Sequence, residues 1–148
     1  MKPAAATAGC ETVFWRVNVK PGKPLFYATA RGGKQLFGLP GNPVSALVCY
    51  ALFVLPALHR RLGIREDDAG LPRYEARLTD ALKNGSNRPH YVRGTLRGGE
   101  FVPRGLQESH GLAGLAEANA LVRVPEKSVI EAEQVVEARL LGALAGGC

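Results

Sequence analysis

The stretch LFGLPGNPVSALVCYALFVLPALHRRLG, residues 36–63, decides how this sequence folds. An apolar segment runs into the PGNP turn at residues 40–43, and an uncharged run follows from residue 44 to 58. Asn42 is a good helix N-cap because its side-chain oxygen can accept a backbone N–H of the first turn. Pro43 suits the first helical position, where its missing N–H would lack a partner in any case. The pattern predicts a strand, a short turn and a helix.

The predicted helix is apolar on nearly every face, which indicates burial on all sides rather than along one stripe. Pro56 removes a backbone hydrogen bond, so we expect a kink there. Arg60, Arg61 and Gly63 suit the end of a helix. The uncharged run has fifteen residues, fewer than the ~20 that cross a bilayer. We therefore expect a buried helix and no membrane span.

The segments before the turn favour strands. Residues 12–19 and 25–29 are rich in β-branched and aromatic residues, and a Gly-Gly turn at residues 30–34 leads to a third strand at 35–39. The last two should form a hairpin. Residues 1–11 carry no pattern, and we expect an irregular start there.

The pattern changes after residue 62. Residues 63–72 have the composition of a linker, and beyond them short alternating segments are separated by Gly, Pro and Asn. This spacing is typical of a small barrel or sandwich. The predicted strands lie at residues 73–80, 90–97, 99–103, 120–125 and 134–141, with one short helix at 109–119.

The net charge of +6 is unevenly divided. Residues 1–65 carry nine Lys or Arg and the single acid Glu11, whereas residues 66–148 carry ten basic and twelve acidic residues. This asymmetry indicates an anionic partner for the first part, such as a phosphate ester or a nucleic acid, unless it is only a solvated basic surface. The sequence lacks the zinc-ligand spacing, basic heptad helix and RNP-like aromatic string of common nucleic-acid binders. We expect neither a nucleic-acid nor a membrane partner.

Cysteine usage bears on the compartment. Cys10, Cys49 and Cys148 form no C-x-x-C pair, and Cys49 stands inside the apolar run, where a thiol acts as a small hydrophobe. An odd number of cysteines without a signal peptide predicts a reducing, cytoplasmic location.

Two loops carry the candidate chemistry. VKPGKP places Lys20 and Lys23 on either side of a Pro-Gly turn, so both ammonium groups can converge on one oxyanion. The PGNP turn opens a helix whose free N–H groups and dipole favour an anion, and Gly41 allows close approach to the backbone. Each loop could equally be an ordinary surface turn, but together they predict a shared anion pocket.

At this separation, KPGKP and GLPGNPVSA, followed by a strand-rich tail containing NRPHYVRG and QESH, resemble the C-terminal part of the MoeA family. These are the molybdopterin molybdotransferases, to which the E domain of gephyrin is similar. The resemblance spans nearly the whole chain from residue 12. It implies an α/β fold, with residues 1–66 forming the C-terminal part of a three-layer molybdenum-cofactor-protein α/β domain. Residues 67–148 would then form a small β-barrel C-terminal domain.

The resemblance also implies a reaction, the insertion of molybdate into adenylylated molybdopterin with release of AMP and with Mg²⁺ as a helper. Lys20 and Lys23 match the family's catalytic lysines. The implied substrate-binding residues are those of the helix-opening turn and one serine of the tail: Pro40, Gly41, Asn42, Pro43, Ser45 and Ser109.

Other positions of the tail are less regular. Arg88 and Arg93 match basic positions of the family's barrel, or are ordinary surface residues. Ser109 follows Glu108, where the family has Gly, so a carboxylate stands beside the supposed oxyanion site.

Family members are longer, so the chain is expected to be a C-terminal fragment or one part of a split enzyme, inactive alone. Its partners would be the missing N-terminal half and a second copy in a homodimer. We expect no metal ligands in this chain, because Glu11 is the only acid before Glu66 and Mg²⁺ prefers carboxylates. Two alternatives remain: a non-catalytic scaffold of the gephyrin E type and a basic anion- or nucleic-acid-binding domain.

Overall fold

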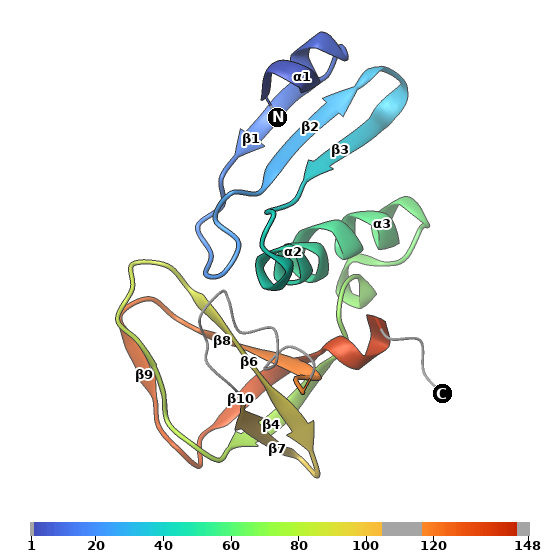
Figure 1. The fold of residues 1–148 in the computed structure, drawn as a ribbon. Coiled ribbons are helices and arrows are strands. Elements are labelled where there is room, and N and C mark those ends of the chain that lie inside the picture. The colour runs from blue at the N-terminus through green and yellow to red at the C-terminus, as the bar shows by residue number, and fades with distance from the viewer. Residues whose placement is uncertain (1, 105–116, 145–148) are drawn as a thin grey trace.

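The computed structural model describes residues 2–104 and 117–144, and it contains a sheet, a long helix and a barrel (Figure 1). The sheet and the helix come from the first part of the chain, and the barrel comes from the second. The helix lies between the sheet and the barrel in Figure 1. This is the predicted fold class, an α/β part followed by a small β-barrel.

The sheet is antiparallel, in the order β1-β2-β3, and its strands are β1 (Glu11–Trp15), β2 (Phe26–Ala30) and β3 (Lys34–Gly38). The predicted hairpin is confirmed, since β2 pairs with β3 across the short turn η1 (Arg31–Gly33). Gly32 and Gly33 adopt φ of 76° and 70° there, a backbone that glycine adopts without steric cost. The expected irregular start is wrong, because α1 (Lys2–Thr7) precedes β1 and its Ala5 packs with Phe26.

The long helix, Pro43–Arg61, has three consecutive segments: α2 (Pro43–Cys49), the π-helical η2 (Tyr50–Val54) and α3 (Leu55–Arg61). The π segment precedes Pro56, and the Leu55 N–H donates to the Tyr50 carbonyl oxygen, five residues back. A wider turn of this kind accommodates a proline that cannot donate. By length and composition the long helix could cross a membrane, a test that core helices of soluble proteins also pass.

Burial of the long helix is one-sided. Its buried residues, Val44, Ser45, Val48, Cys49 and Ala51, fall on one stripe, and α3 contributes none. The expectation of burial on nearly every face is therefore wrong for this chain. The buried stripe packs against the barrel through a cluster that includes Val48, Ala51, Tyr91 and Leu121.

The second part closes into a barrel in the order β10-β4-β7-β6-β8, with a parallel β4–β7 pair. Its strands are β4 (Arg73–Leu78), β6 (His90–Arg97), β7 (Glu100–Pro103), β8 (Ala120–Val124) and β10 (Val135–Leu140). All five were predicted to within a few residues. The prediction missed the short pair β5 (Leu82–Asn84) and β9 (Ser128–Ile130), and the turns η3 (Glu66–Asp68) and η4 (Leu141–Leu144). Residues 109–116 of the predicted short helix lie outside the described residues.

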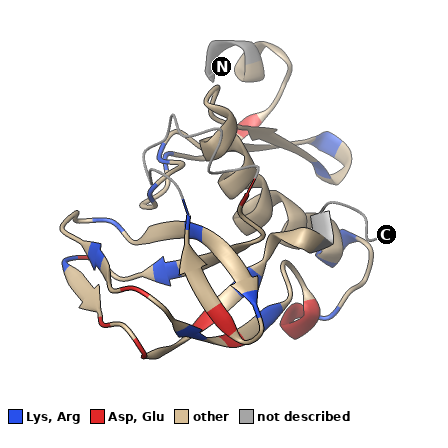
Figure 2. Cartoon of the chain, turned by 60° about the horizontal axis from the view of Figure 1, so that its bottom comes forward, with Lys and Arg blue, Asp and Glu red and all other residues tan. Residues whose placement is uncertain are grey.

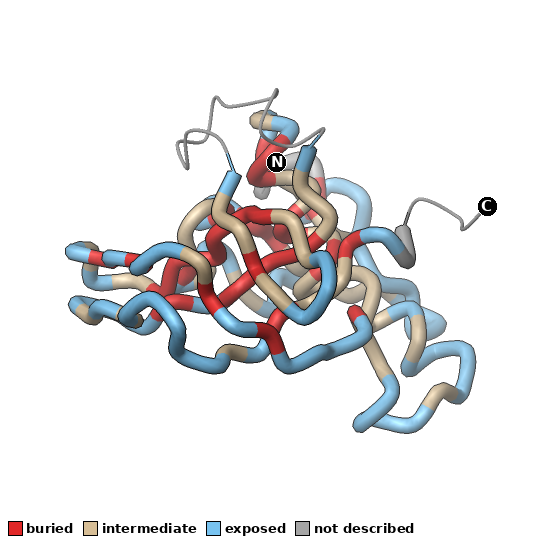
Figure 3. Tube along the Cα trace, turned by 90° about the horizontal axis from the view of Figure 1, so that it is seen from below, coloured by how far each residue is buried: buried red, intermediate tan, exposed pale blue. Residues whose placement is uncertain are grey.

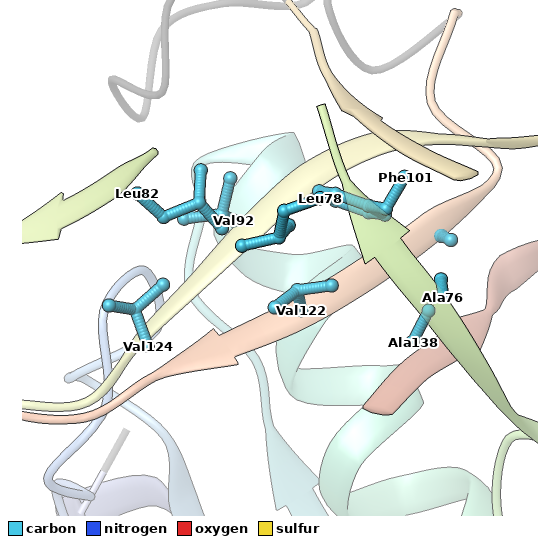
Figure 4. Packing of buried hydrophobic residues seen from close by; sticks show 9 residues of the cluster. Ala76, Leu78, Leu82, Val92, Phe101, Val122, Val124 and Ala138 are labelled. Carbon is cyan, nitrogen blue, oxygen red and sulfur yellow. The ribbon is translucent and has the colours of Figure 1, made fainter. Parts of the chain in front are cut away.

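The barrel core is filled by apolar side chains, of which Leu78, Phe101, Val122 and Val124 are completely or almost completely buried (Figure 4). Gly94 on β6 makes room for the Phe101 ring, since a Cβ at Gly94 would collide with that ring and would lie 2.5 Å from the Val102 carbonyl oxygen. Buried segments run through the middle of the molecule and exposed ones around it (Figure 3).

Candidate anion-binding site

The lysine loop, residues 19–24, carries Lys20 and Lys23 and is packed against the long helix. Gly22, at its centre, is buried with a φ of 122°, and a Cβ there would lie 2.6 Å from the Cys49 Sγ. The Cys49 thiol donates a hydrogen bond of 3.3 Å to the Gly22 carbonyl oxygen. Only glycine fits this position, because any side chain would collide with the helix and the backbone angle is strained for other residues.

The same loop is also joined to the barrel. The Lys20 N–H donates to the Pro89 carbonyl oxygen at 2.9 Å, and the Tyr91 N–H donates to the Lys20 carbonyl oxygen at 2.8 Å. Beside this bridge, the Arg88 guanidinium donates to the Val19 carbonyl oxygen at 3.3 Å. The backbone of Lys20 is therefore held by strand β6, from the second part of the chain.

Within the loop, the Val17 N–H donates to the Lys23 carbonyl oxygen at 2.9 Å, and the Lys20–Pro21 peptide bond is cis. Lys20 is half-buried and Lys23 is exposed. The backbone of the loop is thus fixed on both sides while the lysine side chains keep access to solvent. Lysine is suited to this arrangement because its charge stands at the end of a flexible stem.

The helix begins as the sequence predicts. Asn42 is the N-cap, and its Oδ1 accepts the Ser45 N–H at 3.1 Å, with Pro43 in the first turn. Pro40 and Ser45 are buried, whereas Gly41 and Pro43 are exposed. An added Cβ at Gly41 would meet nothing within 4 Å, so the backbone of the turn is accessible from outside.

The structure packs the lysine loop against the helix that follows the PGNP turn. Gly22 lies against Cys49 and near the Ser45 carbonyl oxygen, which is 3.8 Å from the position of an added Cβ. The lysine loop therefore contacts the first two turns of the helix that Asn42 caps. Ser109 lies outside the described residues. The roles assigned to all of these residues stay predictions.

Sequence reasoning missed Cys49 and the start of β6 as supports of the lysine loop. Burial raises the pKa of the Cys49 thiol to about 11, so the group stays a neutral hydrogen-bond donor at physiological pH. Burial also lowers the pKa of Arg93, which is only 1% exposed and is thus not an ordinary surface residue. For the close contact between the lysine loop and Cys49, the only local sign in the sequence was Gly22, which stands between Pro21 and Pro24.

The acidic residues are concentrated in the second part of the chain, in the sequence as in the fold (Figure 2). Acidic residues lie mostly on the barrel and the η3 turn, while Lys and Arg are spread over both parts (Figure 2). Among the described residues, no group of three His, Cys, Asp or Glu side chains could hold a metal ion. The described side chains around the lysine loop therefore do not fit a Mg²⁺ site.

Comparison with known proteins identifies both parts of the chain. Residues 1–60 match the family described as the probable molybdopterin binding domain, and residues 75–141 match the MoeA C-terminal region, domain IV. The fold and these matches thus define an α/β part of the probable molybdopterin binding domain family, joined to a barrel of the MoeA C-terminal type. The boundary predicted between residues 66 and 67 stays a prediction.

Individual proteins that resemble this chain have names from the same family. The chain is 36% identical to gephyrin of Dictyostelium discoideum, over 87% of this chain and 22% of that protein. It is 35% identical to molybdopterin molybdenumtransferase 2 of Mycobacterium tuberculosis, over 78% of this chain and 28% of that protein. The solved structure of the molybdopterin biosynthesis MoeA protein from Pyrococcus horikoshii superimposes with a TM-score of 0.77 at 28% identity, covering 94% of this chain and 34% of that one.

The chain belongs to the MoeA family of molybdenum cofactor biosynthesis proteins. It spans roughly a fifth to a third of the length of the relatives that it matches.

Proposed function

We propose that this chain forms part of a molybdopterin molybdotransferase, which inserts molybdate into adenylylated molybdopterin and releases AMP. The observation that supports it best is the contact between the lysine loop and the capped helix, through Gly22 and Cys49. This contact holds the backbone between Lys20 and Lys23 against the first two turns of the helix that Asn42 caps. Lysine side chains and a helix N-terminus both stabilise an oxyanion, the first by point charge and the second by its dipole and backbone N–H groups.

Each part of the candidate site has a role in this proposal. Lys20 and Lys23 bind molybdate or the adenylyl phosphate, and Gly41 allows that group to approach the backbone. Pro40 and Pro43 keep the turn rigid, so little conformational entropy is lost on binding. Asn42 and Ser45 form the cap that holds the first turn in place.

The complete reaction needs more polypeptide than this chain supplies. The matched relatives are several times longer, and the Mg²⁺ ligands are expected on parts that the chain does not cover. Association with those parts, a homodimer and a cytoplasmic location belong to the proposal. We expect no AMP release from adenylylated molybdopterin and molybdate when this chain is the only protein present.

Molybdate binding by the chain itself tests the proposal. Replacing both loop lysines, Lys20→Ala with Lys23→Ala, should raise the Kd for molybdate at least tenfold, a loss of about 1.4 kcal/mol. The measurement is isothermal titration calorimetry at low ionic strength, where screening of the two charges is weakest.

Lys83→Ala is the matched control, because it removes one positive charge from an exposed position on β5. It should leave the Kd unchanged. Equal affinity in the wild type and the double variant would remove the lysines from the site, and the proposed function would lose its main support.

A further inference from the structure

A cavity lies beside the long helix, and its helical wall extends from Ala51, two residues beyond Cys49, to Arg60. It has a volume of about 420 Å³ and is enclosed by the helix, the segment after η3 and strands β4 and β10. Pro56, on its helical wall, is thirteen residues beyond Pro43, which at 1.5 Å per residue is about 20 Å. The volume is within the ~300–1,000 Å³ of typical small-molecule sites.

The wall formed by the linker is fixed to the helix. The Gly70 N–H donates to the His59 Nδ1 at 3.1 Å, and the Pro56 ring lies 3.2 Å from the position of an added Cβ at Gly70. Gly70 has a φ of 100°, which favours glycine. Arg60 on the helix and Glu66 on the linker form an ion pair at 3.7 Å. The cavity is therefore built by folded backbone on both sides.

Three arginines, Arg60, Arg73 and Arg139, are among the residues that line the cavity. Each carries five N–H donors in a planar fork. Within the described part of the chain, their only hydrogen bond is from the Arg139 Nε to the Glu137 Oε1, at 3.2 Å. The ion pairs of Arg60 and Arg73 are both 3.7 Å long, which exceeds a hydrogen bond. Many donors therefore remain for an anion.

Positive charge exceeds negative charge among the described residues that line this cavity. Glu66 is the only carboxylate among the described residues of the lining, and Glu137, outside the lining, pairs with Arg73 and Arg139. The described lining thus holds three arginines and one glutamate, while Asp67 and Asp68 line the adjoining hollow. Leu52 and Leu71 add apolar surface to the same lining. A ligand that fits must combine an anionic group with a small apolar body.

We propose that this cavity binds a small organic anion, with a carboxylate or phosphate held by Arg73 and Arg139 and an apolar body against Leu52 and Leu71. Guanidinium forks bind both oxyanions in a bidentate manner, and the apolar floor excludes a purely inorganic ion as the best ligand. This site is separate from the lysine loop and does not depend on its function.

The test is an NMR titration of the ¹⁵N-labelled chain with phenyl phosphate, benzoate, inorganic phosphate and benzyl alcohol. Phenyl phosphate or benzoate should shift the amide resonances of Ala69, Gly70 and Leu71. Inorganic phosphate and benzyl alcohol, each lacking half of the required chemistry, should bind at least tenfold more weakly. The stronger of the two aromatic anions identifies the preferred headgroup.

Arg139→Gln should weaken binding at least fivefold. Because Arg139 also packs over the Tyr91 ring at 5.8 Å, this variant can disturb the barrel as well. Arg73→Gln, at a more exposed position, is therefore a second variant. Arg123→Gln on β8, outside this cavity, is the control for a lost surface charge and should change nothing. Affinity unaltered in both cavity variants, or shifts confined to residues 20–23, would overturn the proposal.

Discussion

The barrel and the α/β part of this chain differ in how many large apolar side chains they leave exposed. In the barrel, five strands close on themselves, and Leu78, Phe101 and Val124 are completely buried. In the α/β part, Trp15 is 46% exposed on the sheet, and Leu62 after the long helix is 78% exposed. Both parts contain completely buried apolar residues, but of the eight large apolar side chains that are exposed among the described residues, five belong to the α/β part and three to the second part.

This difference shows that the apolar composition of a segment determines how much of its surface must be removed from water. The topology of the fold determines which neighbouring elements cover that surface. The long helix is apolar on most faces, but only the stripe facing the barrel and the lysine loop is buried. A three-stranded sheet and one helix supply too few layers to cover the remaining faces. A closed barrel needs no further layer to cover its core, because its own strands enclose that core.

The largest predicted effect tests this contrast directly. Phe101→Ala should destabilise the chain by about 3–5 kcal/mol, because the ring is completely buried and a cavity would remain. Leu62→Ala should cost less than about 0.5 kcal/mol, because the side chain is already exposed. Urea unfolding followed by circular dichroism measures both values. Similar losses for the two variants would mean that the exposed leucine is covered in solution.

The barrel was predictable because its strands alternate between apolar and polar residues. Tyr74, Ala76 and Leu78 set this period in β4, and the alternation is readable without tertiary information. The short β5–β9 pair was missed because three-residue strands contain too little pattern. The one-sided burial of the long helix could not be predicted either. An apolar helix face indicates that something covers it, but the sequence does not say which element does so.

The second prediction concerns the loop at which the two parts meet. Gly22→Ala should destabilise the chain by about 2–3 kcal/mol, since the new Cβ would lie 2.6 Å from the Cys49 Sγ at a φ of 122°. It should also weaken molybdate binding, because the loop must move away from the helix. Thermal unfolding and calorimetry give the two values.

Gly85→Ala is the matched substitution, because an added Cβ would meet nothing within 4 Å and its φ lies outside the left-handed region. It should change neither stability nor binding appreciably. A Gly22→Ala chain as stable as the wild type would show that the contact with Cys49 is looser than the structure indicates.

The candidate site was predictable only in its local parts. Asn42 and Pro43 are recognisable because capping depends on neighbouring residues, and the paired lysines stand three positions apart. The contacts that hold the lysine loop join residues far apart in the chain, such as Gly22 with Cys49 and Lys20 with Tyr91. No local pattern in one sequence encodes such pairings, so the supports of the site needed the structure.

The smallest predicted effect depends on pH and isolates the Cys49 thiol. Its pKa of about 11 in the folded chain lies above the ordinary value of 9.0, because burial disfavours the thiolate. The stabilisation from the neutral thiol is therefore complete below pH 9 and is lost as the pH rises toward 11. Linkage gives a loss of about 2 kcal/mol by pH 11.

Other groups also titrate in this range, so the informative quantity is the stability difference between the wild type and Cys49→Ala. That difference should shrink by about 2 kcal/mol between pH 8 and pH 11 in urea unfolding, because only the wild type has this thiol to ionise. Cys10→Ala is the control for replacing a thiol by a methyl group at a partly buried position. A pH-independent Cys49→Ala difference would mean that solvent reaches the thiol and that the lysine loop is not closed over the helix.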